Sequence, residues 1–215
     1  MGSEMCIRDR NMEPLENYGI QVMSIGFLVD QDEAMIWRGP MATQALEQLL
    51  RQTNWRDLDY LVIDLPPGTG DIHLSLVQAV PLSGAIIVST PQPVAVADAR
   101  KGAWMFRTPQ VNVPLLGIVE NMAFFVPEDL PDRKYFIFGQ DGGARLAETL
   151  GIPLLGQIPL VEDVRTRGDE GNPSALNLDS PTGKAFAGVA AEVARQVAIR
   201  NSQTPPTATV QMQVQ

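Results

Sequence analysis

The chain has 215 residues, of which 45% are hydrophobic and 19% are charged, which favours one α/β domain over two. Its formal charge of −9 argues against nucleic acid as a partner, because neutralising phosphates requires clustered Lys and Arg. The single cysteine, Cys6, excludes an internal disulfide, and no apolar run reaches the length of a membrane span. We therefore expect a cytoplasmic protein that does not bind membranes.

Apolar runs and segments of helical period alternate along the chain from about residue 17. The predicted elements, in order, are a strand at 18–28, a helix after Gly39-Pro40, a strand at 59–65, a helix at about 71–80, a strand at 84–90, a helix at about 95–107, a strand at 115–121, a helix at 143–150, a strand at 154–158 and a helix at 181–200. This alternation predicts an α/β fold with a mostly parallel sheet and helices on both faces.

The two ends of the chain differ in character from this central part. Residues 1–16 are interpreted as a disordered or non-native leader, because the first ten lack any strand or helix period. Residues 17–200 form the predicted domain, and residues 201–215 a disordered tail.

Ligand sites in such sheets lie beyond the carboxyl ends of the strands. The predicted strand at 59–65 contains Asp64 near its end, and a turn rich in proline and glycine leads on to Asp71. Apolar residues followed by Asp match the Walker B pattern, in which a carboxylate holds Mg²⁺ or its waters. On spacing alone, the alternative is an aspartate that caps a turn or a helix.

Longer stretches of the sequence carry a resemblance to a known family. DYLVIDLPPGTGDIHLSL, PLSGAIIVSTPQPVAVADARKG, VPLLGIVENMAFF and IFGQDGGARLAETLGIPLLGQIPL resemble consecutive core blocks of Mrp/ApbC-type iron–sulfur carrier ATPases, from the MinD/ParA branch of the P-loop NTPases. The resemblance runs from about Asn17 to Arg200 and implies a P-loop NTPase domain that is incomplete at its N-terminus. It also implies a protein that carries iron–sulfur clusters to apoproteins with ATP hydrolysis.

The resemblance implies roles for particular residues. Asp64 would hold Mg²⁺ through water, Gly68 and Asp71 would act in catalysis, and Asn121 would bind the adenine edge. The remaining nucleotide-binding residues would be Pro66, Pro67, Gly68, Thr69 and Gly70 in the loop that responds to the γ-phosphate, and Ile158, Pro159 and Leu160 in the turn beside the base. The alternatives are a helix N-cap for Asp71, a strand cap for Asn121 and a strand end at Pro159.

The family's cofactors would be ATP, Mg²⁺ and an iron–sulfur cluster. Its partners would be a second copy in the full-length form, together with iron–sulfur apoproteins and assembly proteins. Two other hypotheses stay open: a MinD/ParA-like positioning ATPase, and a scaffold without catalysis. A positioning ATPase of the MinD type ends in a basic amphipathic helix, whereas residues 201–215 contain neither Lys nor Arg.

The sequence departs from the family at the phosphate-binding loop. A P-loop needs Gly-x-x-x-x-Gly-Lys-Ser/Thr, and the nearest fragment, at 178–185, lacks both the first glycine and the hydroxyl that binds Mg²⁺. We therefore predict that this polypeptide alone does not hydrolyse ATP measurably. We also expect it to be marginally stable or prone to aggregation, because missing neighbours leave strand edges unpaired.

The second departure concerns metal ligands. Many relatives carry Cys-x-x-Cys in the segment that corresponds to 123–135, where this sequence has no cysteine. Either other ligands hold the cluster or the cargo differs. The acidic residues there, Glu128, Asp129 and Asp132, are read as a solvated loop. His73, the only histidine, is read as a surface or packing residue rather than a ligand.

Overall fold

The computed structural model describes residues 11–28, 39–65, 71–127, 129–130 and 133–205. The chain divides into two compact units, Met1–Val80 and Pro81–Gln215. Among the helices that the structure describes, none has the length and apolar character needed to cross a membrane.

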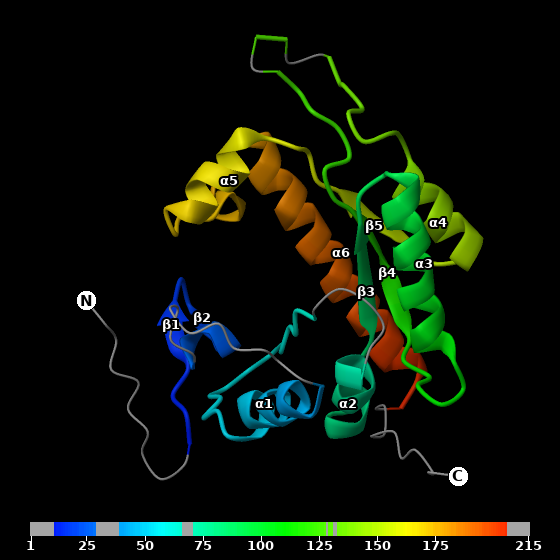
Figure 1. Cartoon of the computed structure of the whole chain (residues 1–215). Helices are drawn as coiled ribbons and strands as arrows, with labels where there is room; N and C mark the ends of the chain where they lie inside the picture. Colours follow the sequence, from blue (N-terminus) through cyan, green and yellow to red (C-terminus); the bar gives the residue numbers. More distant parts are fainter. Residues whose placement is uncertain (1–10, 29–38, 66–70, 128, 131–132, 206–215) are drawn as a thin grey trace. The chain divides into compact units, whose positions relative to one another are not determined.

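The second unit contains a parallel sheet with strand order β3-β4-β5. The strands are β3 (Ala85–Ser89), β4 (Leu115–Glu120) and β5 (Leu154–Gln157), and the helices that cover them are α3 (Pro93–Arg107), α4 (Gly142–Leu150) and α6 (Pro181–Gln203). Figure 1 shows α3 and α4 side by side against the sheet, with α6 on its other side. These elements confirm the predicted α/β fold.

Successive side chains at the end of β4 show why both faces are covered. Val119 packs with Leu155 and Ile158 against α6, whereas the next residue, Glu120, faces α4. This alternation is the two-residue period of a strand. On the α6 face, a Cβ at Gly156 would lie 2.6 Å from a methyl carbon of Val189, so glycine lets the helix approach the sheet closely.

The first unit begins with a hairpin where the sequence predicts a single buried strand at 18–28. Strands β1 (Leu15–Asn17) and β2 (Ile20–Val22) pair antiparallel, and a short 3-10 helix, η1 (Ile25–Phe27), follows. Tyr18 and Gly19 have φ angles of 52° and 75°, which is the left-handed geometry of a two-residue hairpin turn. The chain therefore reverses at Tyr18, and the prediction of one strand is wrong.

The strand predicted at 59–65 is also absent. These residues have no regular secondary structure, and the side chain of Val62 is 86% exposed. A strand is held by hydrogen bonds to a neighbouring strand, and among the described residues no strand pairs with this segment. An apolar run by itself does not make a strand, because a strand also requires a neighbouring strand to pair with.

The α-helices that the structure describes in the first unit match their predictions. Helices α1 (Gly39–Arg51) and α2 (Asp71–Ala79) contact each other, with Thr43 Oγ1 3.2 Å from Ser75 Oγ. His73 is buried on α2 and its Nδ1 atom has no hydrogen-bond partner in the described structure, which favours the packing role.

Residues 11–16 are ordered, although the sequence places them in the leader. The Met12 N–H donates to the Gln52 carbonyl at 2.6 Å, and the Asn54 N–H donates to the Met12 carbonyl at 2.9 Å. The first unit therefore includes this segment, whereas residues 1–10 lie outside the described part of the chain. At the other end, α6 continues three residues beyond the predicted boundary at 200.

The sequence analysis missed α5 (Glu162–Asp169), which leads to a short 3-10 helix, η2 (Ser174–Leu176). The helix has no apolar period to detect, and polar contacts hold it instead. The Ser174 hydroxyl, on a buried residue, lies 2.8 Å from an Asp163 carboxylate oxygen, and Arg167 Nε donates to the other oxygen at 2.7 Å. The pKa of the Asp163 carboxyl lies below its ordinary value, mainly because of the hydrogen bond with the Ser174 hydroxyl and, to a smaller extent, because of the one with Arg167.

We expect Ser174→Ala to raise the Asp163 pKa toward its ordinary value. A carboxyl whose pKa is depressed by folding stabilises the fold above the unfolded pKa of about 4, and this contribution is lost as the pH falls below it. Carboxyl titration by NMR measures the pKa, and amide exchange of α5 measures local opening. Ser202→Ala is the control, because the exposed Ser202 hydroxyl donates to the Ile199 carbonyl on α6, a different helix from that of Asp163. An unchanged Asp163 pKa in Ser174→Ala would contradict the assignment.

Candidate functional site

The carboxyl ends of β4 and β5 bring four of the predicted site residues to one edge of the sheet. Backbone pairing continues past both strands: the Ile158 N–H donates to the Glu120 carbonyl at 2.9 Å, and the Ala123 N–H donates to the Ile158 carbonyl at 3.0 Å. Asn121 follows β4 directly, and Ile158, Pro159 and Leu160 follow β5. The structure therefore places the predicted base-binding turn beside the segment that begins with Asn121.

Asn121 is held in place by hydrogen bonds of its backbone N–H and of its side-chain oxygen. Its N–H donates to the Ser89 carbonyl at 2.8 Å, which ties it to the end of β3. Its Oδ1 accepts from the Met122 N–H at 3.0 Å, and Met122 adopts a left-handed φ of 53°. The side-chain NH₂ makes no hydrogen bond to another described residue, so the half-buried amide offers two donors and one remaining lone pair.

The turn after β5 has the opposite chemistry. The N–H of Ile158 donates to the backbone carbonyl of Glu120, and the N–H of Leu160 donates to the Phe124 carbonyl at 2.8 Å. Pro159 has no N–H. The backbone of this turn can therefore offer a ligand carbonyl oxygens and no donors. Ile158 and Pro159 are buried and Leu160 is half-buried, so the turn is also rigid and largely apolar.

A buried carboxylate directly precedes Asn121. Glu120 has no solvent exposure, and its carboxylate accepts hydrogen bonds from the Gly143 N–H of α4 and, at 2.8 Å, from Gln157 Nε2 of β5. This one side chain links β4, β5 and the first turn of α4 beneath the sheet edge. The sequence analysis missed it, although a charged residue that closes an apolar strand was visible in LLGIVE.

The magnesium and phosphate residues predicted from sequence belong to the first unit. Asp64 is exposed, and Asp71 is the first residue of α2. The loop residues Pro66, Pro67, Gly68, Thr69 and Gly70 lie outside the described residues. A nucleotide site that joins Asp64 and Asp71 to Asn121 therefore stays a prediction.

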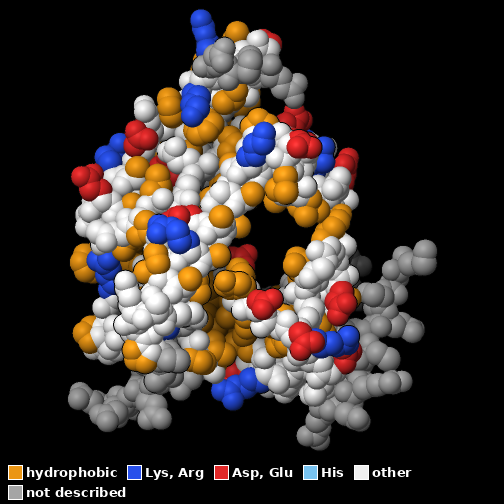
Figure 2. Space-filling view, turned by 180° about the vertical axis from the view of Figure 1, so that it is seen from behind, with side chains coloured by type: hydrophobic (Ala, Val, Ile, Leu, Met, Phe, Trp, Pro, Cys, Tyr) orange, Lys and Arg blue, Asp and Glu red, His pale blue; other side chains and the backbone are white. Residues whose placement is uncertain are grey.

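Metal-binding groups are not clustered in the described part of the chain. No group of three or more His, Cys, Asp or Glu residues there is arranged to hold a metal ion. Asp129 is exposed, whereas Glu128, Asp132 and Cys6 lie outside the described residues. On the face shown in Figure 2, the coloured Lys and Arg side chains are interspersed with acidic ones and form no continuous basic surface.

A parallel sheet covered by helices on both faces, with polar groups gathered at its carboxyl edge, is the arrangement of an α/β protein that binds its ligand beyond the strand ends. The family described as "ParA: NUBPL iron-transfer P-loop NTPase" matches residues 1–194. The chain belongs to this family, which confirms the resemblance found in its sequence.

Relatives in several organisms support the assignment. The chain is 49% identical over 189 residues to the iron–sulfur cluster carrier protein of Synechocystis, covering 87% of this chain and 53% of the relative. It is 49% identical over 187 residues to the mouse iron–sulfur cluster transfer protein NUBPL, covering 86% and 58%. The chain thus spans little more than half the length of these relatives.

Solved structures agree with the fold. A nucleotide-binding protein from Archaeoglobus fulgidus, in complex with ADP, has a TM-score of 0.66 and 33% identity, covering 84% of this chain and 68% of that one. The cell division ATPase MinD of Pyrococcus furiosus has a TM-score of 0.50 and 21% identity, covering 74% and 59%. The likeness to MinD shows the shared fold alone.

Proposed function

We propose that the protein carries iron–sulfur clusters as cargo and transfers them to apoproteins, with ATP binding and hydrolysis in its full-length form. The observation that carries this proposal is the 49% identity to an iron–sulfur cluster carrier across 87% of the chain. We further propose that it acts in the cytoplasm as a homodimer and meets assembly proteins and recipient apoproteins there.

The sheet edge supports adenine as the base. The free NH₂ of Asn121 can donate to a ring nitrogen of adenine, while a carbonyl of the 158–160 turn can accept from its exocyclic amine. Guanine presents a carbonyl oxygen where adenine presents that amine, so two acceptors would face each other. The lack of backbone donors in the turn therefore favours ATP over GTP.

The phosphate side of the site would come from the first unit. Asp64 is exposed, so its carboxylate is free to hold the waters of Mg²⁺, an ion that neutralises the charge on the phosphates. The loop residues Pro66, Pro67, Gly68, Thr69 and Gly70 would lie against the γ-phosphate. Asp71, at the start of α2, would either orient the attacking water or cap the helix.

The cargo requires ligands that the described residues do not supply. Iron–sulfur clusters are held mainly by Cys thiolates, and the segment 123–135 has none. Either ligands outside this segment hold the cluster or the protein carries a different cargo. Measuring the bound metal therefore tests the function directly.

The decisive experiment is anaerobic purification of the protein at the length of its relatives, followed by iron and sulfide analysis and a visible spectrum. We expect both elements and a charge-transfer spectrum, together with ATP turnover that Asp64→Ala abolishes. A protein without iron and sulfide that binds lipid vesicles in the presence of ATP would instead be a positioning ATPase. A protein with neither cluster nor turnover would be a scaffold.

The base-binding residues have a separate test in the same full-length protein. Asn121→Ala removes the amide that contacts adenine, and we expect the dissociation constant for ATP to rise about fivefold, since a neutral hydrogen bond contributes roughly 1 kcal/mol. We also expect the preference for ATP over GTP to shrink. Asn201→Ala, on the exposed end of α6, is the control. Unchanged ATP affinity in Asn121→Ala would refute the base contact.

A further inference from the structure

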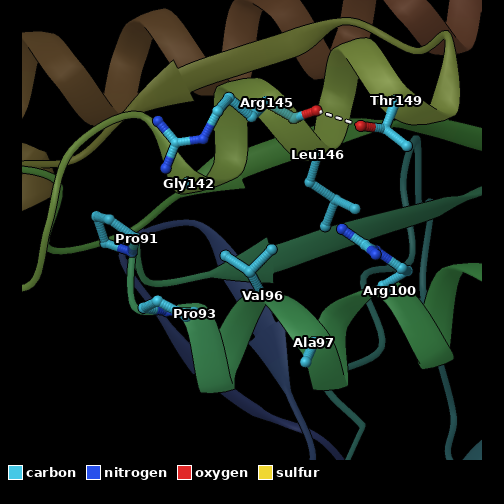
Figure 3. Close-up of a pocket in the computed structure, with 9 residues that line it drawn as sticks. All are labelled: Pro91, Pro93, Val96, Ala97, Arg100, Gly142, Arg145, Leu146 and Thr149. Carbon is cyan, nitrogen blue, oxygen red and sulfur yellow. Dashed lines mark hydrogen bonds between the residues drawn. The ribbon is translucent and has the colours of Figure 1, made fainter.

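A groove of about 450 Å³ runs between α3 and α4, and none of the residues that line it is among those assigned to the nucleotide. At one end the first residue of α4 meets the loop before α3 closely: a Cβ at Gly142 would lie 2.3 Å from the Pro91 carbonyl oxygen. Val96 of α3 and Leu146 of α4 line the groove further along (Figure 3). Its lining is mostly apolar, apart from two arginines and Thr149.

The two arginines come from opposite walls. Arg100 belongs to α3 and Arg145 to α4. In Figure 3 the guanidinium of Arg145 lies toward Pro91 and Gly142, whereas that of Arg100 lies beside Leu146. Val96 is drawn between them. Positive charge therefore flanks an apolar centre along the groove.

Neither guanidinium has a counter-ion within the described structure. Arg165, Arg167 and Arg195 each pair with a carboxylate on their own helix. No ion pair or side-chain hydrogen bond joins Arg100 or Arg145 to another described residue, and both are exposed. In a chain of net charge −9, two unpaired arginines on one groove form a local site for anions.

We propose that this groove binds an acidic segment of a partner protein. An apolar side chain of the segment lies on Val96 and Leu146, and carboxylates on either side of it pair with Arg145 and Arg100. The planar guanidinium group matches a carboxylate through two parallel hydrogen bonds, which makes arginine suited to this role. A polyanion such as nucleic acid fits less well, because the net charge of the chain repels it and the groove is mostly apolar.

The test uses the 215-residue chain and a fluorescein-labelled peptide that carries one leucine between two pairs of glutamates. Fluorescence anisotropy at low salt gives the dissociation constant. We expect Arg100→Gln and Arg145→Gln each to weaken binding about tenfold, which is the loss of one charge-assisted contact. Arg133→Gln makes the same charge change at an exposed site outside the groove and serves as the control.

Two further peptides separate the parts of the recognition. Replacing the glutamates by glutamines removes the charge, and replacing the leucine by serine removes the apolar contact; we expect both to bind more weakly. Since both arginines are exposed, their variants should keep the circular dichroism spectrum and melting temperature of the parent chain.

The proposal fails if the glutamate peptide does not bind, or if Arg133→Gln weakens peptide binding as much as the groove variants do. It also fails if the glutamine peptide binds equally well. Because none of these residues belongs to the nucleotide site, the result is independent of the proposed ATPase function.

Discussion

Glu120→Ala is expected to lower the free energy of unfolding by about 3 kcal/mol, because it leaves one buried and one half-buried hydrogen-bond donor without an acceptor. Those donors are the Gly143 N–H of α4 and the amide of Gln157 in β5. The side chain is also fully buried, so its removal opens a cavity that adds to the loss. Urea denaturation followed by circular dichroism measures the change.

The matched control is Glu148→Ala, which removes the same side chain from an exposed position on α4. Because alanine is a good helix former, we expect this variant to change stability by less than about 0.5 kcal/mol. Glu120→Gln should lie between the two, since an amide keeps an acceptor oxygen for one donor only. Equal stabilities of Glu120→Ala and Glu148→Ala would show that the buried carboxylate does not hold the three elements together.

The role of Glu120 links stability to the nucleotide site. Its carboxylate fixes the end of β4 against β5 and α4, and Asn121 is the next residue. A shift of the strand end would therefore move the amide that we assign to adenine. For this reason we expect Glu120→Gln to weaken ATP binding in the full-length protein even where the fold survives.

Sequence patterns predicted the second unit well because its elements are defined locally. The strand GAIIVST and the strand LLGIVEN are short apolar runs, and the helix at 93–107 begins with a proline in its first turn. Short connections between such elements leave few ways to arrange them. Boundaries consequently agree to within one residue for β3, β4, β5 and α4.

The same reasoning failed where structure depends on a partner or on backbone geometry. The run at 59–65 contains four consecutive apolar residues, YLVI, yet among the described residues it has no neighbour to pair with. In the first hairpin, Tyr18 adopts a left-handed conformation that its residue type does not favour, so the residue type at this position did not predict the turn. Helix α5 lacks an apolar face and is held by Asp163 and Ser174, whose contact joins residues eleven positions apart.

The same distinction separates the site residues that sequence patterns predicted from the one that they missed. The positions of Asn121 and the 158–160 turn followed from the rule that adjacent parallel strands end at one edge. Glu120 escaped prediction because its importance comes from the burial of its carboxylate among groups from α4 and β5. No local pattern shows that a strand-terminal glutamate will point inward, toward a glycine whose N–H needs an acceptor.

Two glycines of α6 should respond to the same substitution with opposite signs. Gly183 is buried in the first turn, where its N–H donates to the capping Ser180 hydroxyl at 2.9 Å. A Cβ there would lie 1.9 Å from the Asn177 carbonyl oxygen, a backbone atom that cannot rotate away. We expect Gly183→Ala to destabilise the fold by about 3 kcal/mol, since the clash forces the backbone to move and also disturbs the cap.

Gly188 lies one and a half turns further along the same helix, where a Cβ would meet no atom within 4 Å. It is exposed, so Gly188→Ala adds a good helix former without a steric cost and should stabilise the fold by about 0.5–1 kcal/mol. Melting temperatures of the two variants, measured beside the parent chain, show whether each substitution lowers or raises stability. If Gly183→Ala were as stable as Gly188→Ala, the start of α6 would not be pressed against the Asn177 backbone, and the helix would be free to shift along β4 and β5.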